Sequence, residues 1–326
     1  MNDINTGEIT DVKTQQFALD IRDGLQSTPK RLPSKYFYDE IGDKLFQDIM
    51  QLEEYYLTRS EYEILNTYKS EILKVINRDG GFDLFELGAG DGYKTKLLLK
   101  HFVDEKVDFA YHPIDISGNV LQELSEALTA EIPDLKVRPL EGDYFKMLGN
   151  ISHNSEARKL ILFLGSNIGN FSQEEALKFL TMLRDSLEVG DYTLIGVDLK
   201  KDPAVILAAY NDSSGTTKSF NLNLLNRIND TLGAGFDTDK FIHSPSYDPQ
   251  TGECRSYLLS TEEQIIDIPG LEASYHFRSW EPIHMEISKK YHLQELELLA
   301  EKAGFELVRH FTDSKGYFVD SLWRAK

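Results

Sequence analysis

Alternating glycines in residues 85–92, which read Phe-Glu-Leu-Gly-Ala-Gly-Asp-Gly, are the first feature of this sequence that could do chemistry. Glycines between a strand and a helix let backbone N–H groups approach a polar ligand, and the helix N-terminus favours negative charge. The spacing of Gly88, Gly90 and Gly92 differs from the Gly-x-Gly-x-x-Gly pattern of dinucleotide sites. Because Glu86 also precedes the glycines, the turn favours a ligand with both an ammonium and a carboxylate over a pyrophosphate.

Acidic residues follow the two strands expected after the glycine turn, at 108–114 and 136–140. Asp115 ends the second strand, where a carboxylate can accept both hydroxyls of a ribose, and Asp143 follows the third, where it can accept from an adenine amine. Tyr144 or Phe145 would lie beside the ring, and Lys94 can pair with a ligand carboxylate. A helix-capping role is the alternative for each aspartate. Such a site suits S-adenosylmethionine, and the residues predicted to bind it are Gly88, Gly90, Lys94, Asp115, Asp143 and Tyr144.

Strands and helices alternate from residue 83 to residue 210, which predicts a parallel, doubly wound sheet. The expected strands are short apolar runs at 83–87, 108–114, 136–140, 159–165 and 193–199. The expected helices have 3.6-residue apolar spacing, at 94–102, 120–131, 173–187 and 203–210. Ligands of such sheets bind at the carboxyl ends of the strands, where the residues above fall. A helix at 292–303 and strands at 305–312 and 317–323 close the chain, and a final antiparallel hairpin of this kind is common in S-adenosylmethionine-dependent methyltransferases.

The rest of the chain departs from this alternation and predicts a second domain. Residues 1–78 contain three expected helices, at 15–25, 44–50 and 61–76. Residues 201–287 are rich in expected strands, with a helix at 220–232 and strands at 241–247, 254–260, 262–268 and 274–286. We therefore expect an α/β chain with a Rossmann-like, S-adenosylmethionine-binding methyltransferase core at 79–200. A second, α+β substrate-binding domain would combine 1–78 with 201–287, and 288–326 would return to the core sheet.

The composition limits the partners of the chain. Its 326 residues include 35 Lys and Arg against 54 Asp and Glu, and this net charge of −19 disfavours nucleic acids and anionic membranes. The lone Cys254 excludes an intrachain disulfide, and the eight histidines include no His-Glu-x-x-His pair, so we expect no metal. No apolar run reaches the roughly 20 residues of a membrane span, and the polar N-terminus is unlike a signal peptide. We expect a cytoplasmic monomer that acts on a small molecule.

Longer motifs run through most of the chain and are far more specific than the glycine turn. They are residues 32–39 (LPSKYFYD), 54–61 (EYYLTRSE), 163–171 (FLGSNIGNF), 198–202 (DLKKD), 209–212 (AYND), 220–229 (FNLNLLNRIN) and 285–288 (MEIS). From about Thr28 to Trp323 the sequence resembles the histidine-specific Nα-methyltransferases of ergothioneine biosynthesis, a branch of the S-adenosylmethionine-dependent methyltransferases. The resemblance implies a Rossmann-type core and a second domain that closes over an amino-acid substrate.

The same resemblance implies a set of substrate-binding residues. Asn170 and Tyr210 match the positions that hold the substrate carboxylate, and both side chains are neutral donors, which avoids a buried charge pair. Glu286, Ser288 and Tyr55 match the positions that hold the imidazole. A carboxylate that accepts from one imidazole N–H fixes the tautomer, and a hydroxyl can serve the other nitrogen.

Three more positions follow from the resemblance. Tyr38 matches a tyrosine near the reacting amine, which makes it the candidate catalytic residue, while Thr217 and Phe220 match further pocket positions. Taken alone, such aromatic residues would be interpreted as core residues, since aromatics dominate packing. Arg59 and Glu61 suggest no more than a surface or structural ion pair.

One strand departs from the family pattern. Where the family carries an acidic residue followed by methionine, residues 254–258 read Cys-Arg-Ser-Tyr-Leu, and Asn167 stands where the family often has threonine. The predicted function is methyl transfer from S-adenosylmethionine to the α-amine of L-histidine, repeated up to the trimethylated betaine, hercynine. The competing interpretations are methylation of another amino acid or aromatic amine such as tryptophan, and a non-catalytic Rossmann-fold binding protein. The glycine spacing disfavours a dehydrogenase.

Overall fold

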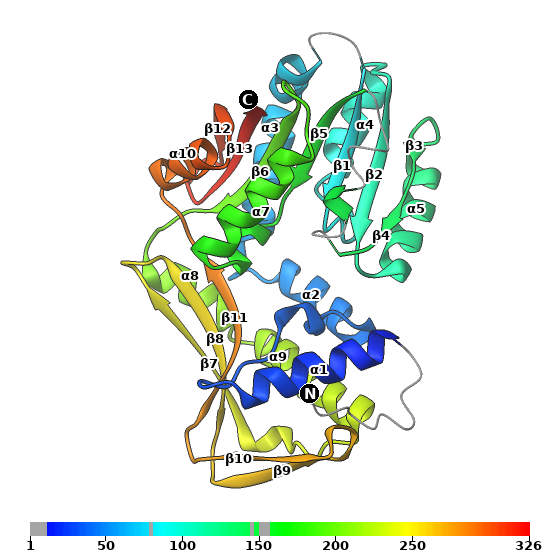
Figure 1. The fold of residues 1–326 in the computed structure, drawn as a ribbon. Helices are drawn as coiled ribbons and strands as arrows, with labels where there is room; N and C mark the ends of the chain where they lie inside the picture. Colours follow the sequence, from blue (N-terminus) through cyan, green and yellow to red (C-terminus); the bar gives the residue numbers. More distant parts are fainter. Residues whose placement is uncertain (1–11, 78–80, 144–146, 150–156) are drawn as a thin grey trace. The chain divides into compact units, whose positions relative to one another are not determined.

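The computed structural model describes residues 12–77, 81–143, 147–149 and 157–326 (Figure 1). The chain divides into two compact units. The N-terminal unit comprises the described residues up to Tyr55 together with Asp202–Asp248 and Glu253–Ile287. The sheet unit comprises the described residues of Tyr56–Lys201 together with Pro249–Gly252 and Ser288–Lys326.

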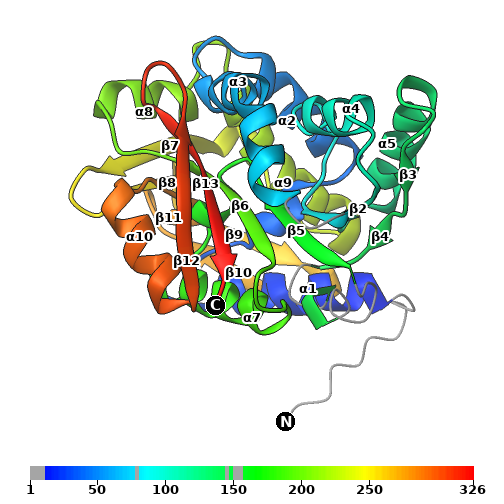
Figure 2. The ribbon, with the colours of Figure 1, turned by 90° about the horizontal axis from the view of Figure 1, so that it is seen from above.

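A mainly parallel sheet forms the centre of the sheet unit (Figures 1 and 2). Its order is β12-β13-β6-β5-β1-β2-β3, and β4 also pairs with β2. The strands are β1 (Phe82–Leu87), β2 (Phe109–Asp115), β3 (Lys136–Val137), β4 (Leu140–Glu141), β5 (Arg158–Phe163), β6 (Tyr192–Asp198), β12 (Phe305–Thr312) and β13 (Phe318–Ala325). Strands β2, β1, β5 and β6 run parallel, whereas β13 lies antiparallel between β6 and β12. The expected α/β fold with a final antiparallel hairpin is confirmed.

Helices cover both faces of this sheet. They are α3 (Tyr56–Ile76), α4 (Lys96–Asp104), α5 (Gly118–Glu131), α7 (Gln173–Asp185) and α10 (Leu293–Lys302). Helices α3 and α4 lie on one face, and α7 and α10 lie on the other (Figure 2). Helix α7 begins at a capping box between Ser172 and Glu175. Phe179 of α7 is fully buried together with Phe163 and Trp323 of the sheet, and each such side chain contributes about 2 to 3 kcal/mol of hydrophobic stabilisation.

The N-terminal unit combines helices with small antiparallel sheets (Figure 1). Its helical elements are α1 (Val12–Gln26), η1 (Ser34–Phe37), α2 (Glu40–Gln51), α8 (Pro203–Tyr210), α9 (Thr216–Leu232), η3 (Thr238–Lys240) and η4 (Pro269–Leu271). Its strands form the sheet β11-β8-β7 and the pair β9–β10, with β7 (Phe241–Asp248), β8 (Glu253–Ser260), β9 (Gln264–Ile268), β10 (Ala273–Phe277) and β11 (Pro282–Lys289). The last residues of β11, Ser288 and Lys289, belong to the sheet unit. Buried and half-buried residues alternate along β8, as in any strand with one packed face.

Two expected strands are each divided in the structure. The strand expected at 136–140 consists of the short strands β3 and β4, because Pro139 between them has no N–H to donate to a sheet. The strand expected at 274–286 consists of β10 and β11. Between them the chain turns at Trp280, whose φ of 66° is left-handed, and whose N–H donates to the Ser260 carbonyl at 2.6 Å.

The boundary of the first domain also differs from the expectation. Residues 56–77 group with the sheet unit, so the N-terminal segment ends at Tyr55 rather than at residue 78. The physical reason is the packing of α3, whose face with Ile64, Leu65 and Ile72 is fully buried against the sheet. Hydrophobic burial on this scale fixes a helix to one unit, whatever its place in the chain.

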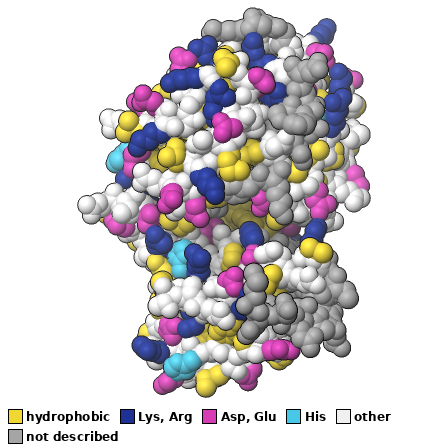
Figure 3. Space-filling view, viewed as in Figure 1, with side chains coloured by type: hydrophobic (Ala, Val, Ile, Leu, Met, Phe, Trp, Pro, Cys, Tyr) yellow, Lys and Arg dark blue, Asp and Glu magenta, His cyan; other side chains and the backbone are white. Residues whose placement is uncertain are grey.

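Figure 3 shows acidic and basic side chains interspersed over the displayed face of the molecule. Within the described ranges, no helix is long and apolar enough to cross a membrane. The same residues contain no group of three or more His, Cys, Asp or Glu side chains arranged to hold a metal ion.

Candidate active site

The glycine turn after β1 has backbone angles that glycine adopts far more readily than other residues. Gly88, Gly90 and Gly92 have φ angles of 74°, 53° and 64°. The turn is tied to β2, since the Gly88 N–H donates to the Ile114 carbonyl at 2.8 Å. Apart from Gly90 and its two chain neighbours, no atom of the described residues lies within 4 Å of the place where a Gly90 Cβ would project. A ligand can therefore approach the Gly90 backbone closely.

Asp115 lies beside this turn, at the end of β2. Its carboxylate accepts from the Gly90 N–H at 3.1 Å and from the Ser117 N–H at 3.1 Å. Burial raises the pKa of Asp115, and these N–H donors oppose the rise. The cap of α5 is Ser117 rather than Asp115, because the Ser117 hydroxyl accepts from the Val120 N–H. The structure thus brings two predicted cofactor positions, Gly90 and Asp115, into direct contact.

Asp143 follows a strand that pairs with the end of β2. Asp115 lies opposite Glu141 in the β2–β4 register, and the Gly142 N–H donates to the Asp115 carbonyl at 2.9 Å. These contacts bring the backbone before Asp143 to the strand end that carries Asp115. Tyr144, the remaining predicted cofactor residue, lies outside the described residues.

Glu86, which precedes the glycines, is buried and bonded to the protein through both oxygens. It accepts from Thr95 Oγ1 at 2.5 Å and from the Tyr111 hydroxyl. Burial raises the pKa of Glu86 to about 7, against the lowering effect of these two hydrogen bonds. Glu86 therefore ties β1 to β2 and to the start of α4, instead of presenting its carboxylate to a ligand.

Lys94 contacts a carboxylate of the protein itself. Its ammonium meets the fully buried Glu61 of α3, which also accepts from the Gly165 N–H at 2.8 and 3.0 Å. Burial alone would lower the pKa of Lys94, but the charge of Glu61 and its hydrogen bond raise it above the ordinary value. The sequence predicts a ligand carboxylate as the partner of Lys94, and the structure shows Glu61 in contact with it. The feature of the sequence that could have indicated this pairing is the position of Glu61 on the apolar face of α3.

A second buried carboxyl group, that of Asp320 on β13, lies next to Glu61. Gly196 on β6 makes room for both, because a Cβ there would lie 1.9 Å from Glu61 Oε1 and 3.2 Å from Asp320 Oδ1. Neither oxygen of Asp320 has a hydrogen-bond donor among the described residues. Burial raises the pKa of Asp320 well above its ordinary value, and the charge of Glu61 raises it further. A proton on Asp320 turns the repulsion between the two groups into a hydrogen bond.

Asn170 and Ser288, two predicted substrate residues, come from segments whose backbones touch. Asn170 ends the short helix η2 (Asn167–Asn170), which follows β5. A Cβ at Gly169 would lie 2.7 Å from the Lys289 carbonyl oxygen, so only glycine fits against the segment that carries Ser288. Both residues therefore lie near the carboxyl ends of β5 and β6, the edge where this kind of sheet binds ligands.

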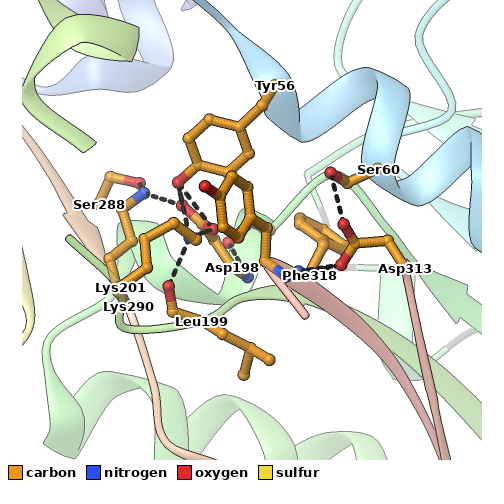
Figure 4. A network of polar contacts seen from close by, with 11 residues as sticks. Tyr56, Ser60, Asp198, Leu199, Lys201, Ser288, Lys290, Asp313 and Phe318 are labelled. Atoms are coloured by element: carbon orange, nitrogen blue, oxygen red, sulfur yellow. Dashed lines mark hydrogen bonds and ion pairs between the residues drawn. The ribbon is translucent and has the colours of Figure 1, made fainter. Parts of the chain in front are cut away.

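A buried polar network surrounds Asp198 at the end of β6 (Figure 4). The Asp198 carboxylate accepts from the Tyr56 hydroxyl at 2.7 and 2.9 Å and from the Lys201 ammonium at 2.5 Å. The ammonium of Lys290, which is 0% exposed, lies 2.9 Å from Asp198 Oδ2 and 2.9 Å from Ser288 Oγ. Of these residues only Ser288 has a role predicted from the sequence, and the contacts of Asp198 with Tyr56 and Lys290 join residues far apart in the chain.

Four predicted substrate residues of the N-terminal unit belong to one chain of aromatic contacts. The rings of Tyr38 and Phe220 are 5.7 Å apart, and Phe46 lies 5.8 Å from Phe220 and 6.4 Å from Tyr55. Tyr55 lies 6.3 Å from Tyr210. These distances between ring centroids are typical of packed aromatic pairs. The structure therefore brings these four residues into one cluster, together with Phe46, which the sequence analysis did not single out.

Thr217 and Glu286 lie on two other elements of the N-terminal unit. Thr217 is buried in the first turn of α9, and its N–H donates to Asp212 Oδ1 at 2.8 Å. Burial raises the pKa of Asp212, but hydrogen bonds from Ser214 and Thr217 outweigh this effect and lower the pKa to about 2. The charged Asp212 carboxylate therefore fixes the start of α9. Glu286 is half-buried on β11, two residues before Ser288. The alternation of a strand directs side chains at that spacing to the same face.

A family model for histidine-specific, S-adenosylmethionine-dependent methyltransferases matches residues 17–325. The chain belongs to this family. The family expected from the sequence motifs is thereby confirmed.

Three curated proteins are similar to most of this chain. A histidine N-alpha-methyltransferase of Mycolicibacterium smegmatis is 36% identical over 303 residues, which cover 93% of this chain and 93% of that protein. Ergothioneine biosynthesis protein 1 of Neurospora crassa is 34% identical over 310 residues, which cover 91% of this chain and 34% of that protein. An L-tryptophan methyltransferase of Psilocybe serbica is 26% identical over 330 residues, which cover 94% of this chain and 92% of that protein.

Strand β8 carries the departure from the family pattern. Cys254 and Ser256 are buried on its packed face, at 2% and 3% exposure. Tyr257 lies on the other face, where its ring is 5.5 Å from that of His284 on β11. Of the two residues that could occupy the family's methionine position, Ser256 is thus on the packed face and Tyr257 is not.

Proposed function

We propose that this chain transfers methyl groups from S-adenosylmethionine to the α-amine of L-histidine. The observation that carries the proposal is the family match over residues 17–325, together with 36% identity to a histidine N-alpha-methyltransferase over 93% of both chains. The geometry of the described residues supports it. Within the sheet unit, a glycine turn suited to a small polar ligand lies at the carboxyl ends of the parallel strands, as do Asn170 and Ser288, two of the residues assigned to the substrate.

The residues around the glycine turn fit S-adenosylmethionine. The open space beside Gly90 admits the methionine part, the carboxylate of Asp115 suits two ribose hydroxyls, and Asp143 suits the adenine amine. Lys94 has three N–H donors and can serve the methionine carboxylate while it keeps its contact with Glu61. When bound, S-adenosylmethionine supplies an electrophilic methyl group on a positively charged sulfur.

The substrate-binding residues carry over from the family resemblance. Asn170 and Tyr210 would hold the substrate carboxylate with neutral donors, and this avoids a buried charge pair. Glu286 would accept from one imidazole N–H, while Ser288 and Tyr55 bond the rest of the ring. Buried polar groups that match the substrate in this way also reject analogues that leave them unpaired.

The contribution of the protein to the reaction is positioning. Tyr38 would orient the α-amine, and Thr217 and Phe220 would bound the pocket, so that the neutral nitrogen faces the methyl group in line with the bond that breaks. We assign no general base. For repeated methylation, the same residues have to accept the mono- and dimethylated products.

A second candidate substrate is tryptophan or a similar aromatic amine. The departure at β8 and the 26% identity to an L-tryptophan methyltransferase favour it over the remaining amino acids. We also propose that the chain works as a cytoplasmic monomer without a nucleic-acid or membrane partner. The net charge of −19 and the single cysteine of the sequence support this, since disulfides are rare in reducing compartments.

Incubation of the purified protein with labelled S-adenosylmethionine and each of the common amino acids tests the proposal. We expect label on histidine, and the product mass then gives the number of methyl groups added. Label on tryptophan but not on histidine would replace the first candidate by the second. Label on no amino acid would leave a binding protein without this activity. Light scattering on the same sample tests the monomeric state.

A further inference from the structure

One face of helix α9 lies against the segment that carries Tyr38, and both belong to the N-terminal unit. Phe220, Asn223 and Arg227 are spaced by three and four residues, so they share this face of the helix. The ring of Phe220 is 5.7 Å from that of Tyr38, and Asn223 donates to Asp39 Oδ1 at 2.9 Å. The proposed function gives a role to Phe220 but none to Asn223 or Arg227.

Arg227 holds the backbone of this segment. Its Nη1 atom donates to the Tyr36 carbonyl at 2.9 Å and to the Tyr38 carbonyl at 3.2 Å. The guanidinium also lies over the rings of Phe17 and Tyr36, at 5.2 and 5.6 Å from their centroids. A guanidinium presents its N–H groups at fixed angles in one plane, so Arg227 can contact these rings and bind both carbonyls at once.

The backbone on either side of Tyr38 is fixed by the start of α2. Asp39 Oδ1 accepts from the Gly42 N–H at 2.7 Å and caps this helix. Gly42 packs on the end of η1, because a Cβ there would lie 1.8 Å from the Phe37 carbonyl oxygen. Tyr38 is the single residue between η1 and this cap, with a φ of −88° and a ψ of 91°. The chain is therefore held before, at and after Tyr38.

The Tyr38 ring packs against two aromatic rings of the same unit. Its centroid lies 5.7 Å from those of Phe46 and Phe220, at interplanar angles of 79° and 66°. Such edge-to-face contacts are typical of packed aromatic pairs. Tyr38 is half-buried, so part of its side chain stays accessible. A side chain whose backbone and ring are both fixed in this way needs little reorganisation when a substrate binds.

We propose that Arg227 is a positioning residue that fixes the orientation of Tyr38 towards the reacting amine. The inference rests on the proposed function, in which Tyr38 orients the α-amine of histidine. Arg227 sets the Tyr38 carbonyl, and this sets the direction in which the Tyr38 side chain leaves the backbone. Methyl transfer depends on alignment of the nitrogen with the breaking bond, and a misplacement of about 1 Å can slow such a step about a hundredfold. Loss of Arg227 should therefore slow the transfer step more than it weakens the binding of either ligand.

The test is a double-mutant cycle between Arg227 and Tyr38, read out as the rate of the first methyl transfer to histidine in a single turnover. Arg227→Met keeps an unbranched side chain on the rings of Phe17 and Tyr36 and removes the donors to the two carbonyls, so the fold should persist. We expect the rate to fall about tenfold, while KM for histidine and the affinity for S-adenosylmethionine change by about twofold or less. In a Tyr38→Phe background, the same substitution should change the rate by about twofold or less.

Two further variants separate positioning from folding. Arg227→Lys keeps a cation with N–H donors on the same face of α9 and should restore part of the rate lost in Arg227→Met. The matched control is Tyr36→Phe on the same segment, because it removes only the hydroxyl that donates to Asp20 Oδ2 at 2.7 Å. The ring remains in contact with Phe17, and the carbonyl of residue 36 remains available to Arg227. This control should lower the melting temperature without changing the rate of methyl transfer.

The cycle distinguishes a positioning role of Arg227 from a purely structural one. A purely structural Arg227 would lower the rate by the same factor with and without the Tyr38 hydroxyl, and this result would overturn the inference and leave the proposed function standing. A Tyr38→Phe variant as fast as the wild type would also overturn it, because Arg227 would then have no group to position. A wild-type protein that does not methylate histidine would overturn both.

Discussion

The paired carboxyl groups of Glu61 and Asp320 lead to a prediction about stability and pH. We expect Asp320→Asn to stabilise the protein at neutral and alkaline pH. Asparagine has the same shape and carries no charge, and its amide can donate to Glu61 as a protonated Asp320 would. Because Gly196 leaves room for both side chains, the substitution should introduce no steric conflict.

The pH dependence of this stabilisation follows from the direction of the pKa shift of Asp320. Burial and the charge of Glu61 raise the folded-state pKa of Asp320 well above the ordinary value of 3.8. Between these two pKa values the folded protein binds a proton that the unfolded chain has lost, so the free energy of unfolding falls as pH rises. The slope of this contribution is about 1.4 kcal/mol per pH unit. Asp320→Asn removes it, and the advantage of the variant should grow with pH at that rate.

Urea unfolding of both proteins at several pH values measures this difference. The matched control is Asp313→Asn on the same hairpin, because Asp313 accepts from the Phe318 N–H at 2.8 Å and the Tyr317 N–H at 2.7 Å. That variant weakens two hydrogen bonds to a carboxylate and should lose stability at neutral pH. If Asp320→Asn proved less stable than the wild type by a constant amount at every pH, the shared proton between Asp320 and Glu61 would be refuted.

Three further predictions concern the ligand sites. Glu286→Ala should weaken histidine binding at least tenfold and leave S-adenosylmethionine binding unchanged, and equal losses in calorimetry would make Glu286 a structural residue. Asp115→Ala should weaken S-adenosylmethionine binding by about 2 to 3 kcal/mol, and an unchanged affinity in the same assay would remove Asp115 from the cofactor site. Gly90→Ala should cost about 1 kcal/mol of stability, because its φ of 53° is unfavourable for alanine, and a melting temperature equal to that of the wild type would contradict the strained turn.

Much of the fold could be predicted because local sequence patterns indicate most of its strands and helices. The apolar runs of β5 and β6 and the helical spacing of α7 each report their own structure. Prediction was less accurate where one residue interrupts a pattern, as Pro139 does between β3 and β4. It was also less accurate where a helix had to be assigned to a domain, since the sequence of α3 shows an apolar face and not the surface that covers it.

The contacts of the candidate site likewise include some that could be predicted from the sequence and some that could not. Gly90 and Asp115 could be predicted as neighbours, because parallel strands bring their carboxyl ends to one edge. The contacts of Lys94 with Glu61 and of Lys290 with Ser288 and Asp198 depend on which side chains point inward and how far they reach. No spacing rule encodes such pairs when the partners lie on separate elements. For the substrate residues, the family motifs supplied what local patterns could not.

The packing of α3 has a consequence for how this methyltransferase could be divided or recombined. Nucleotide-binding cores are often treated as modules that begin at their first strand, which here would mean a cut shortly before β1. Such a fragment would lack Glu61, which holds Lys94 and the Gly165 N–H, and Tyr56, which donates to Asp198. The smallest transferable cofactor module therefore begins at α3, because a chimera joined at β1 would leave Lys94 and the Gly165 N–H without Glu61 and would deprive Asp198 of the Tyr56 hydroxyl.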